Sequence, residues 1–379
     1  MLSRHGNIEE EMNWKRVPES QGWIQRLGEW AIRKHTFMPR MLDLEVSRVC
    51  NLGCPSCMRH ASSSLSHLDN KYCTLDTFRK IHEEIPTIGT LNFMGDGEPL
   101  MNPELDDIIH YSSLNNIHTV VTTNATLITQ EIIAQWKRNK VYRIHASIDA
   151  AKKDVYEKLR VGAEWGKTYE NLKILGKSGI ALCLNCILYE DTMPYMPDMV
   201  RLCVEVGSKE VSYLMPLVTW GTDVGVRPKD NPENRYLFEV TRRKCKELGV
   251  RWTFPLTLNP TFRRFNFPFI RPEVSADGDV YACCYSLGRG KVWFEGYGYE
   301  LGPNDYRMGN IFKEGFRKVW YGEDYKRVRD IYIKSEVKKG TIISRQELLN
   351  KTRIIFENPK RDRFDHCLVC LARWGAACS

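Results

Sequence analysis

Three cysteines close together near the beginning of the sequence are the residues most able to do chemistry. Cys50, Cys54 and Cys57 lie in the stretch Cys-Asn-Leu-Gly-Cys-Pro-Ser-Cys. Three thiolates at this spacing can wrap one compact metal centre, whereas an iron–sulfur cubane normally takes four. A three-thiolate loop therefore leaves one iron open for a ligand that is not protein. The spacing alone is also compatible with a zinc site completed by His60, or with three unrelated core cysteines.

The elements around these cysteines alternate between short apolar runs and amphipathic stretches. The sequence predicts strands at Met41–Val46, Thr90–Met94, His118–Thr122, Tyr142–Ile148, Ala181–Tyr189 and Glu210–Leu217. Helical patterns between them include Thr74–Glu84, Ile128–Arg138 and Tyr195–Val206. Such alternation predicts an α/β fold with a parallel sheet, either doubly wound or a partial barrel. Both architectures place their chemistry at the carboxyl ends of the strands, and the cysteines follow the first strand.

The stretch from Leu44 to Cys57, Leu-Glu-Val-Ser-Arg-Val-Cys-Asn-Leu-Gly-Cys-Pro-Ser-Cys, resembles the signature of the radical S-adenosylmethionine (SAM) superfamily. The resemblance implies an iron–sulfur enzyme built on a partial (β/α)6 TIM-type barrel. In that family the three thiolates bind a [4Fe–4S] cluster, SAM takes the open iron, and one electron cleaves SAM to a 5′-deoxyadenosyl radical. Ser56 departs from the pattern, because an aromatic residue is common there; we expect a weaker packing contact and unchanged ligation.

Several strand ends resemble the segments that hold SAM in this family. Gly95-Asp-Gly-Glu-Pro99 is similar to a GGEP-type turn, whose glycines admit a ligand close to the backbone and whose carboxylate suits an ammonium group. Asp96 replaces its first glycine. Thr122-Thr-Asn124 is similar to a TNG-like corner, and Arg160 matches an arginine that pairs with the methionine carboxylate. The resemblance implies cofactor contacts from Gly95, Gly97, Glu98, Pro99, Thr123, Asn124, Ser147, Asp149, Arg160 and Asn185. Each could instead be an ordinary turn or helix residue.

A second group of cysteines lies toward the carboxyl end. Val274–Tyr281 reads as a hairpin with Asp277-Gly278 in its turn, and Cys283 and Cys284 follow it. Far downstream stand Cys367-Leu-Val-Cys370 and Cys378. A hairpin cysteine and a distant pair of this kind can also form a structural zinc site.

The segment Pro268–Cys284, with Met308–Ile311 and Val319-Trp320, resembles the SPASM/twitch extension of radical enzymes. It implies one auxiliary [4Fe–4S] cluster held by Cys283, Cys367, Cys370 and Cys378. Phe265 stands where such families place a cysteine, so the fourth ligand comes from Cys284, Cys378 or a non-protein donor. The expected domains are an extension over 1–40, a barrel over 41–255 and a SPASM/twitch-like domain over 256–379.

Composition places the chain among cytoplasmic globular proteins. Of 379 residues, 42% are hydrophobic and 27% are charged, and we find neither a secretory signal nor an apolar run long enough for a membrane span. In a reducing compartment, thirteen cysteines point to metal binding or catalysis rather than to disulfides. The net charge of +8 is compatible with a basic face exposed to solvent. The sequence contains no nucleic-acid-binding module that would indicate a nucleic-acid partner.

Three functions follow. The first is hydrogen abstraction from a small polar molecule of the sugar or aminocyclitol type, giving dehydrogenation or epimerisation, with a flavodoxin or ferredoxin as electron donor. The second is maturation of a ribosomal peptide by crosslinking or epimerisation, with Trp14, Trp23 and Trp30 as a docking surface. The third is a zinc-binding interaction protein without turnover. The sequence identifies no catalytic side chain. The remaining cysteines are expected to be inert thiols of the core, namely Cys73, Cys183, Cys186, Cys203 and Cys245. One of them could instead donate a hydrogen atom to a substrate radical.

Overall fold

The computed structural model describes residues 37–57, 59, 71–216, 228–255, 270–282, 291–294, 297–300 and 307–333. The chain divides into two compact units, Met1–Phe37 and Met38–Ser379, and all described residues except Phe37 belong to the second.

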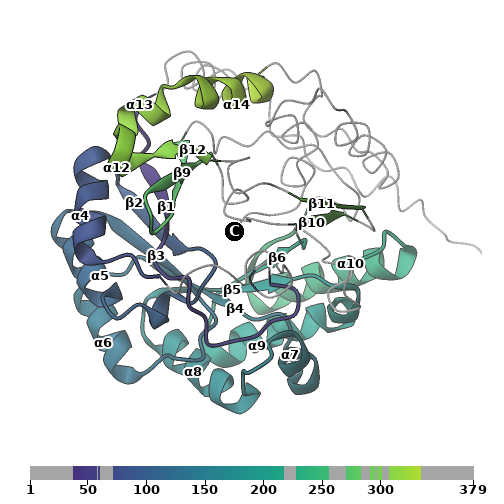
Figure 1. Cartoon of the computed structure of the whole chain (residues 1–379). Helices are drawn as coiled ribbons and strands as arrows, with labels where there is room; N and C mark the ends of the chain where they lie inside the picture. Colours follow the sequence, from purple (N-terminus) through teal and green to yellow (C-terminus); the bar gives the residue numbers. More distant parts are fainter. Residues whose placement is uncertain are drawn as a thin grey trace, which may run out of the picture. The chain divides into compact units, whose positions relative to one another are not determined.

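A sheet of ten strands, in the order β12-β9-β8-β1-β2-β3-β4-β5-β6-β7, is the central element of the second unit (Figure 1). The seven strands β1 to β7 all run parallel to one another in this sheet. They are β1 (Met41–Glu45), β2 (Thr90–Met94), β3 (His118–Thr123), β4 (Arg143–Ser147), β5 (Ala181–Ile187), β6 (Glu210–Leu214) and β7 (Arg251–Thr253). A doubly wound sheet reverses its strand order at a switch point, and this sheet does not. The sequential order is that of an open, partial barrel, and the six predicted strands are confirmed.

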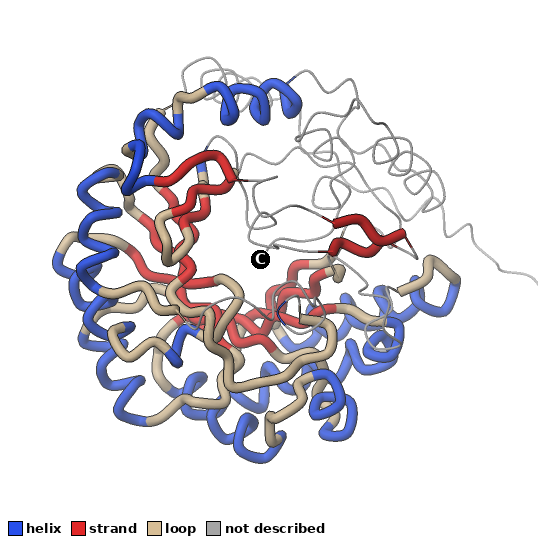
Figure 2. The backbone as a smooth tube through the Cα atoms, in the orientation of Figure 1, coloured by secondary structure: helices blue, strands red, loops and turns tan. Residues whose placement is uncertain are grey.

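Helices lie along the outer side of the curved sheet (Figure 2). They are α4 (Leu75–Glu84), α5 (Leu105–Leu114), α6 (Gln130–Arg138), α7 (Lys153–Leu159), α8 (Trp165–Lys177), α9 (Met196–Val206) and α10 (Pro232–Leu248), with 3-10 turns η2 (Pro99–Met101) and η3 (Glu190–Tyr195). Side-chain caps fix several starts; for example, Thr74 accepts from the Thr77 amide at α4 and Thr129 from the Ile132 amide at α6. Among the described residues, no helix is long and apolar enough to cross a membrane.

The carboxyl-terminal strands extend the same sheet past β1. The predicted hairpin is confirmed as β8 (Glu273–Val274) and β9 (Asp279–Tyr281), with Gly278 at a φ of 79° in the turn. β8 pairs in parallel with β1, and β12 (Arg307–Asn310) pairs with β9. The remaining elements are β10 (Lys291–Phe294) paired with β11 (Tyr297–Glu300), and the helices α12 (Ile311–Glu314), α13 (Phe316–Trp320) and α14 (Glu323–Ile333).

The two faces of the parallel sheet differ in chemistry. Side chains facing the helices are apolar and buried, for example Leu44, Phe93 and Ile144, none of which is exposed to solvent. On β4 the residues between them, Arg143, His145 and Ser147, are polar and only half-buried. Because side chains alternate along a strand, the inward face of the barrel is polar while its outward face packs against the helices.

Candidate cofactor-binding site

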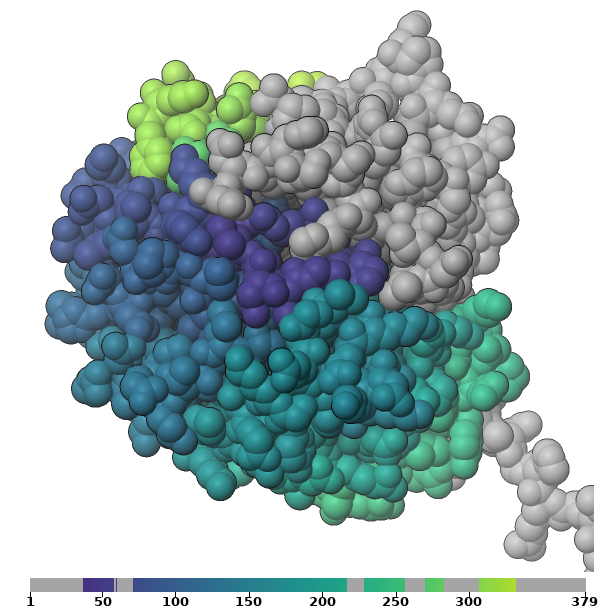
Figure 3. All heavy atoms as spheres, turned by 60° about the horizontal axis from the view of Figure 1, so that its bottom comes forward, coloured from purple at the N-terminus to yellow at the C-terminus, as the bar shows by residue number. Residues whose placement is uncertain are grey.

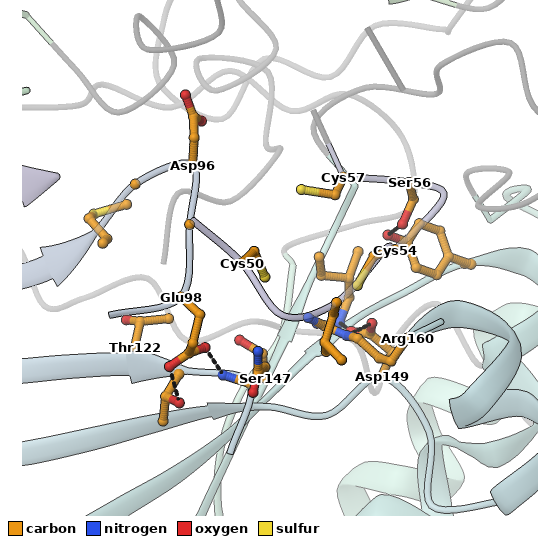
Figure 4. Close-up of a pocket in the computed structure, with 18 residues that line it drawn as sticks. Cys50, Cys54, Ser56, Cys57, Asp96, Glu98, Thr122, Ser147, Asp149 and Arg160 are labelled. Carbon is orange, nitrogen blue, oxygen red and sulfur yellow. Dashed lines mark hydrogen bonds and ion pairs between the residues drawn. The ribbon is translucent and has the colours of Figure 1, made fainter. Parts of the chain in front are cut away.

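The three cysteines lie in one loop directly after β1. In Figure 4 the sulfur atoms of Cys50, Cys54 and Cys57 face a shared space at the carboxyl end of the sheet. None is in a disulfide, and the Cys57 amide donates to the Cys54 carbonyl at 3.0 Å. Figure 3 shows this segment in purple at the surface, beside blue and teal atoms of the barrel. Topology therefore brings the predicted ligands together where an α/β sheet carries its active site.

This donor set fits an iron–sulfur cluster better than one zinc ion. Within the described ranges, no group of three or more His, Cys, Asp or Glu residues could hold a single metal ion. A cluster binds each thiolate through a different iron, so its thiolates stand farther apart than those around one ion. Burial raises the pKa of all three thiols, that of Cys57 to about 12, so cationic iron would offset the cost of the thiolates. His60 lies outside the described residues.

The turn after β2 forms the second wall of the site. Gly97 packs directly on the chain before Cys50, so that a Cβ added to it would lie 2.5 Å from the Ser47 carbonyl oxygen and 2.6 Å from that of Val49. The Glu98 amide donates to the same Val49 oxygen at 2.8 Å. Only glycine permits this approach, which explains the turn's composition.

Glu98 joins this turn to the end of β3. Its carboxylate is 2% exposed and accepts hydrogen bonds from Thr123 Oγ1 at 2.5 Å and from the Asn124 amide at 2.7 Å (Figure 4). Burial raises the pKa of Glu98, although these donors act against it. Both carboxylate oxygens thus accept a hydrogen bond from Thr123 at the end of β3 or from Asn124 just after it. The Glu98 side chain therefore holds the ends of β2 and β3 together.

The corner after β3 continues to the cysteine loop. Asn124 Nδ2 donates to Asn51 Oδ1 at 2.9 Å, and Asn51 Nδ2 donates to Thr126 Oγ1 at 2.8 Å. Asn51 lies between the first two cysteines. The predicted glycine turn, corner and cysteine loop are thus linked by direct hydrogen bonds.

A partly buried ion pair forms the wall opposite the glycine turn. Arg160 Nε lies 2.7 Å from Asp149 Oδ2, and Asp149 Oδ1 accepts from the Ile187 amide at 3.1 Å. The guanidinium also contacts the Cys54 thiol. After Arg160 the chain returns to the loop, where the Gly53 amide donates to the Val161 carbonyl at 2.8 Å. Asp149 therefore orients a cation beside the second cysteine.

An aromatic ring reaches the site from beyond β5. Tyr189 is 3% exposed and lines the cavity, and its hydroxyl donates to Ser56 Oγ at 2.8 Å. Ser56 is the position at which we expected a weakened packing contact. Tyr189 places its ring beside this small side chain, so aromatic surface is supplied from the segment that follows β5. The sequence predicted a strand through this residue and did not identify it as part of the site.

These walls enclose a cavity of about 300 Å³. The predicted residues that line it are Cys50, Cys54, Cys57, Gly95, Gly97, Glu98, Thr123, Asn124, Ser147, Asp149 and Arg160. Leu52, Met94, Asp96, Ile187 and Tyr189 also line it and were not assigned to the site from sequence. Pro99 begins η2 behind the turn, and Asn185 lies deeper in the barrel, so neither lines the cavity. Cys283, Cys284, Cys367, Cys370 and Cys378 lie outside the described residues.

Comparisons with known proteins match this geometry. A model of the radical SAM superfamily matches residues 44–203, and a model of the SPASM iron–sulfur cluster-binding domain matches residues 267–370. The chain belongs to the radical SAM superfamily. This radical SAM enzyme therefore binds SAM and a [4Fe–4S] cluster, and its SPASM domain implies auxiliary iron–sulfur chemistry.

Relatives of this radical SAM enzyme carry different functional names. It is 23% identical over 318 residues to the AdoMet-dependent heme synthase of Methanosarcina barkeri, covering 78% of this chain and 86% of that protein. It is 25% identical over 180 residues to the PqqA peptide cyclase of Gluconobacter oxydans, covering 46% and 48%. The structure of Streptococcus suis SuiB bound to precursor peptide SuiA superposes with a TM-score of 0.61 at 17% identity, covering 86% and 75%. The names of these relatives differ from one another, and the match to SuiB shows a shared fold.

Proposed function

We propose that this radical SAM enzyme abstracts a hydrogen atom from a carbon of a small polar substrate of the sugar or aminocyclitol type, leading to dehydrogenation or epimerisation. A flavodoxin- or ferredoxin-type donor would supply the electron. When bound, the cluster and SAM together supply a 5′-deoxyadenosyl radical. The observation that carries the proposal is the convergence of three free thiols, the Asp149–Arg160 ion pair and polar strand ends on one cavity.

The residues of the cavity have separable tasks in this proposal. Cys50, Cys54 and Cys57 hold the cluster, and Arg160, oriented by Asp149, pairs with the carboxylate of SAM. Gly95 and Gly97 admit the amino group close to the backbone, while Glu98 adds negative potential and fixes the corner of β3. Ser147 and Asn124 offer polar atoms to the ribose and methionyl groups.

Reductive cleavage of SAM tests this proposal. Anaerobically reconstituted protein reduced with dithionite is expected to convert SAM to 5′-deoxyadenosine, and Cys54→Ala is expected to lose this activity. Cys245→Ala is the matched control, because Cys245 is a fully buried free thiol of α10 outside the cavity. Cleavage that persists at the wild-type rate in Cys54→Ala would contradict the proposal.

A ribosomal peptide is the second candidate substrate. The likeness to a peptide cyclase and to a protein bound to its precursor peptide supports it. Deuterium transfer into 5′-deoxyadenosine separates the two candidates, with perdeuterated cyclitols in one arm and deuterated precursor peptides in the other. The auxiliary cluster, proposed as a single one held by Cys283, Cys367, Cys370 and Cys378, is tested by counting iron and sulfide per chain in the Cys367→Ala variant.

A further inference from the structure

Directly below the cofactor cavity the inward face of β4 is partly exposed, and we call the space in front of it the hollow. Along β4 the inward residues Arg143, His145 and Ser147 are each half-buried, although β4 is flanked on both sides by other strands. The outward residues Ile144 and Ala146 are fully buried. A closed barrel of this class fills its interior with layers of bulky apolar side chains. Solvent reaches the inward face here because the space in front of it is not packed.

Three polar side chains form one level of this hollow. Asn92, His145 and Asn185 each stand two residues before a residue that lines the cofactor cavity, namely Met94, Ser147 and Ile187. Side chains two residues apart on a strand share one face, about 7 Å apart along the strand. The level therefore lies one step deeper than SAM would, on the same inward face.

Hydrogen bonds fix the orientation of these three side chains. His145 Nδ1 lies 3.2 Å from Asn185 Oδ1, which the Cys183 thiol also approaches at 3.5 Å. Asn92 Nδ2 donates to Asp43 Oδ1 at 2.9 Å, and Arg271 Nε donates to the same oxygen at 2.6 Å. The Asp43–Arg271 ion pair is neutral as a whole.

The chemistry of the remaining atoms is specific. Burial lowers the pKa of His145, so its ring is neutral near pH 7. Since Asn185 Oδ1 accepts, Nδ1 of the neutral ring donates and Nε2 is left as an acceptor. Neither His145 Nε2, Asn185 Nδ2 nor Asn92 Oδ1 has a hydrogen bond to the described part of the chain, yet Asn92 is 8% and Asn185 4% exposed. Two acceptors and one amide donor thus face a polar hollow.

We propose that Asn92, His145 and Asn185 form the substrate floor of this enzyme and bind neighbouring hydroxyl groups of a neutral polyhydroxylated ring. This inference rests on the proposed function and deepens it. Hydroxyl groups both donate and accept, which matches an uncharged set of amides and imidazole. A charged substrate would need a counter-ion, whereas Asp43 and Arg271 already form an ion pair with each other.

Ligand binding tests the floor without depending on turnover. Saturation-transfer NMR with myo-inositol as the probe is applied to the reconstituted holoprotein with SAM and without reductant. Wild type is expected to bind, and Asn185→Leu and His145→Phe are each expected to weaken binding about tenfold, the equivalent of one to two hydrogen bonds. SAM affinity is expected to stay unchanged in both variants, which shows that they are folded.

Asn139→Leu is the matched control. Asn139 Oδ1 lies 3.0 Å from His110 Nδ1 at the outer end of α6, so it repeats the amide–imidazole pair away from the barrel interior. Unchanged inositol binding in Asn185→Leu and His145→Phe would overturn the floor, as would wild type that fails to bind inositol or that takes deuterium only from a peptide. Loss of SAM cleavage in wild type with inositol binding intact would instead contradict the proposed function alone.

Discussion

Arg48 Nη2 lies 2.6 Å from Asp277 Oδ2, an ion pair between the residue two places before Cys50 and the turn of the β8–β9 hairpin. Arg48 is 3% exposed and also lies 2.9 Å from Glu45 Oε2, which in turn accepts from the Ala276 amide at 3.1 Å. Lys71 is a further ion-pair partner of Asp277. The loop that carries the cluster ligands is therefore anchored to the SPASM region through one charged network.

Asp277→Asn removes the outer charge of this network. We expect the free energy of unfolding to fall by about 1–2 kcal/mol, because Arg48 stays buried with fewer partners while Asp277 is partly exposed. Urea unfolding measures the change. Asp198→Asn, which breaks the exposed pair with Arg201, is the control and should change stability by less than about 0.5 kcal/mol. Equal effects of the two substitutions would show that the network adds nothing beyond a surface pair.

Glu210 predicts an acid-dependent loss of stability. Burial acts to raise its pKa, but Arg143 at 3.0 Å and Arg251 at 2.9 Å outweigh it, so the folded pKa is lowered. Such a group stabilises the fold above its unfolded pKa of about 4.3, and the stability is lost as pH falls through the lower folded value. Glu210→Gln should therefore cost about 1 kcal/mol at pH 7, and the difference from wild type should shrink below about pH 4.

Urea unfolding of both proteins at a series of pH values checks this sign. Glu170→Gln is the control, because Glu170 is 65% exposed and pairs only with Lys173 on the same helix. A difference between Glu210→Gln and wild type that grows as the solution is acidified would refute the assignment.

Gly97→Ala should disrupt the site without touching a ligand. The added methyl meets two backbone oxygens at 2.5 and 2.6 Å, so the chain before Cys50 must move. We expect a cost of about 1–3 kcal/mol and a fall in iron bound after reconstitution. Gly166→Ala in α8 is the matched control, since nothing lies within 4 Å of its added methyl. Normal iron content in Gly97→Ala would mean that the close approach is not required.

Tyr189 separates a ring contribution from a hydroxyl contribution. Tyr189→Phe loses only the 2.8 Å hydrogen bond to Ser56. Because that bond joins two protein residues, we expect the free energy of unfolding to fall by about 1 kcal/mol and SAM to bind within about twofold of wild type. Tyr189→Leu also loses the aromatic surface and should weaken binding further. Equilibrium dialysis of SAM against the reconstituted proteins measures both. Tyr236→Phe, on the exposed side of α10, should bind as wild type does.

Local patterns explain what the sequence predicted well. Strand, turn and helix signals lie within a few residues of each other, so the six strands, the hairpin and the loop from Cys50 to Cys57 were predictable. Glu98 and Asn124 were also found, because they follow β2 and β3, the next two strands after β1 in the sheet. Their hydrogen bond to each other, at 2.7 Å, was not specified, since it depends on how two strand ends meet.

Non-local geometry explains what was missed. Tyr189 was placed inside the fifth strand, but β5 ends at Ile187, and the change of direction brings the ring back to Ser56. Asn185, expected at the cofactor because it lies on the fifth strand, is two residues before the end of β5 and beside His145. The pairing of β8 with β1 joins residues that are 230 positions apart in the sequence. The Arg271–Asp43 hydrogen bond next to this pairing spans 228 positions. No local sequence pattern encodes such contacts.

That pairing has a consequence for biosynthesis. As the nascent polypeptide leaves the ribosome, β1 can acquire β2 early, but its other edge must wait until the region around Glu273 has been made. An uncovered strand edge is a template for unwanted association. During synthesis there is thus an interval in which the metal-binding cysteines are already translated, while β1, the strand before them, has a partner on only one edge. Delivery of iron and sulfide after chain completion would avoid trapping that half-built form.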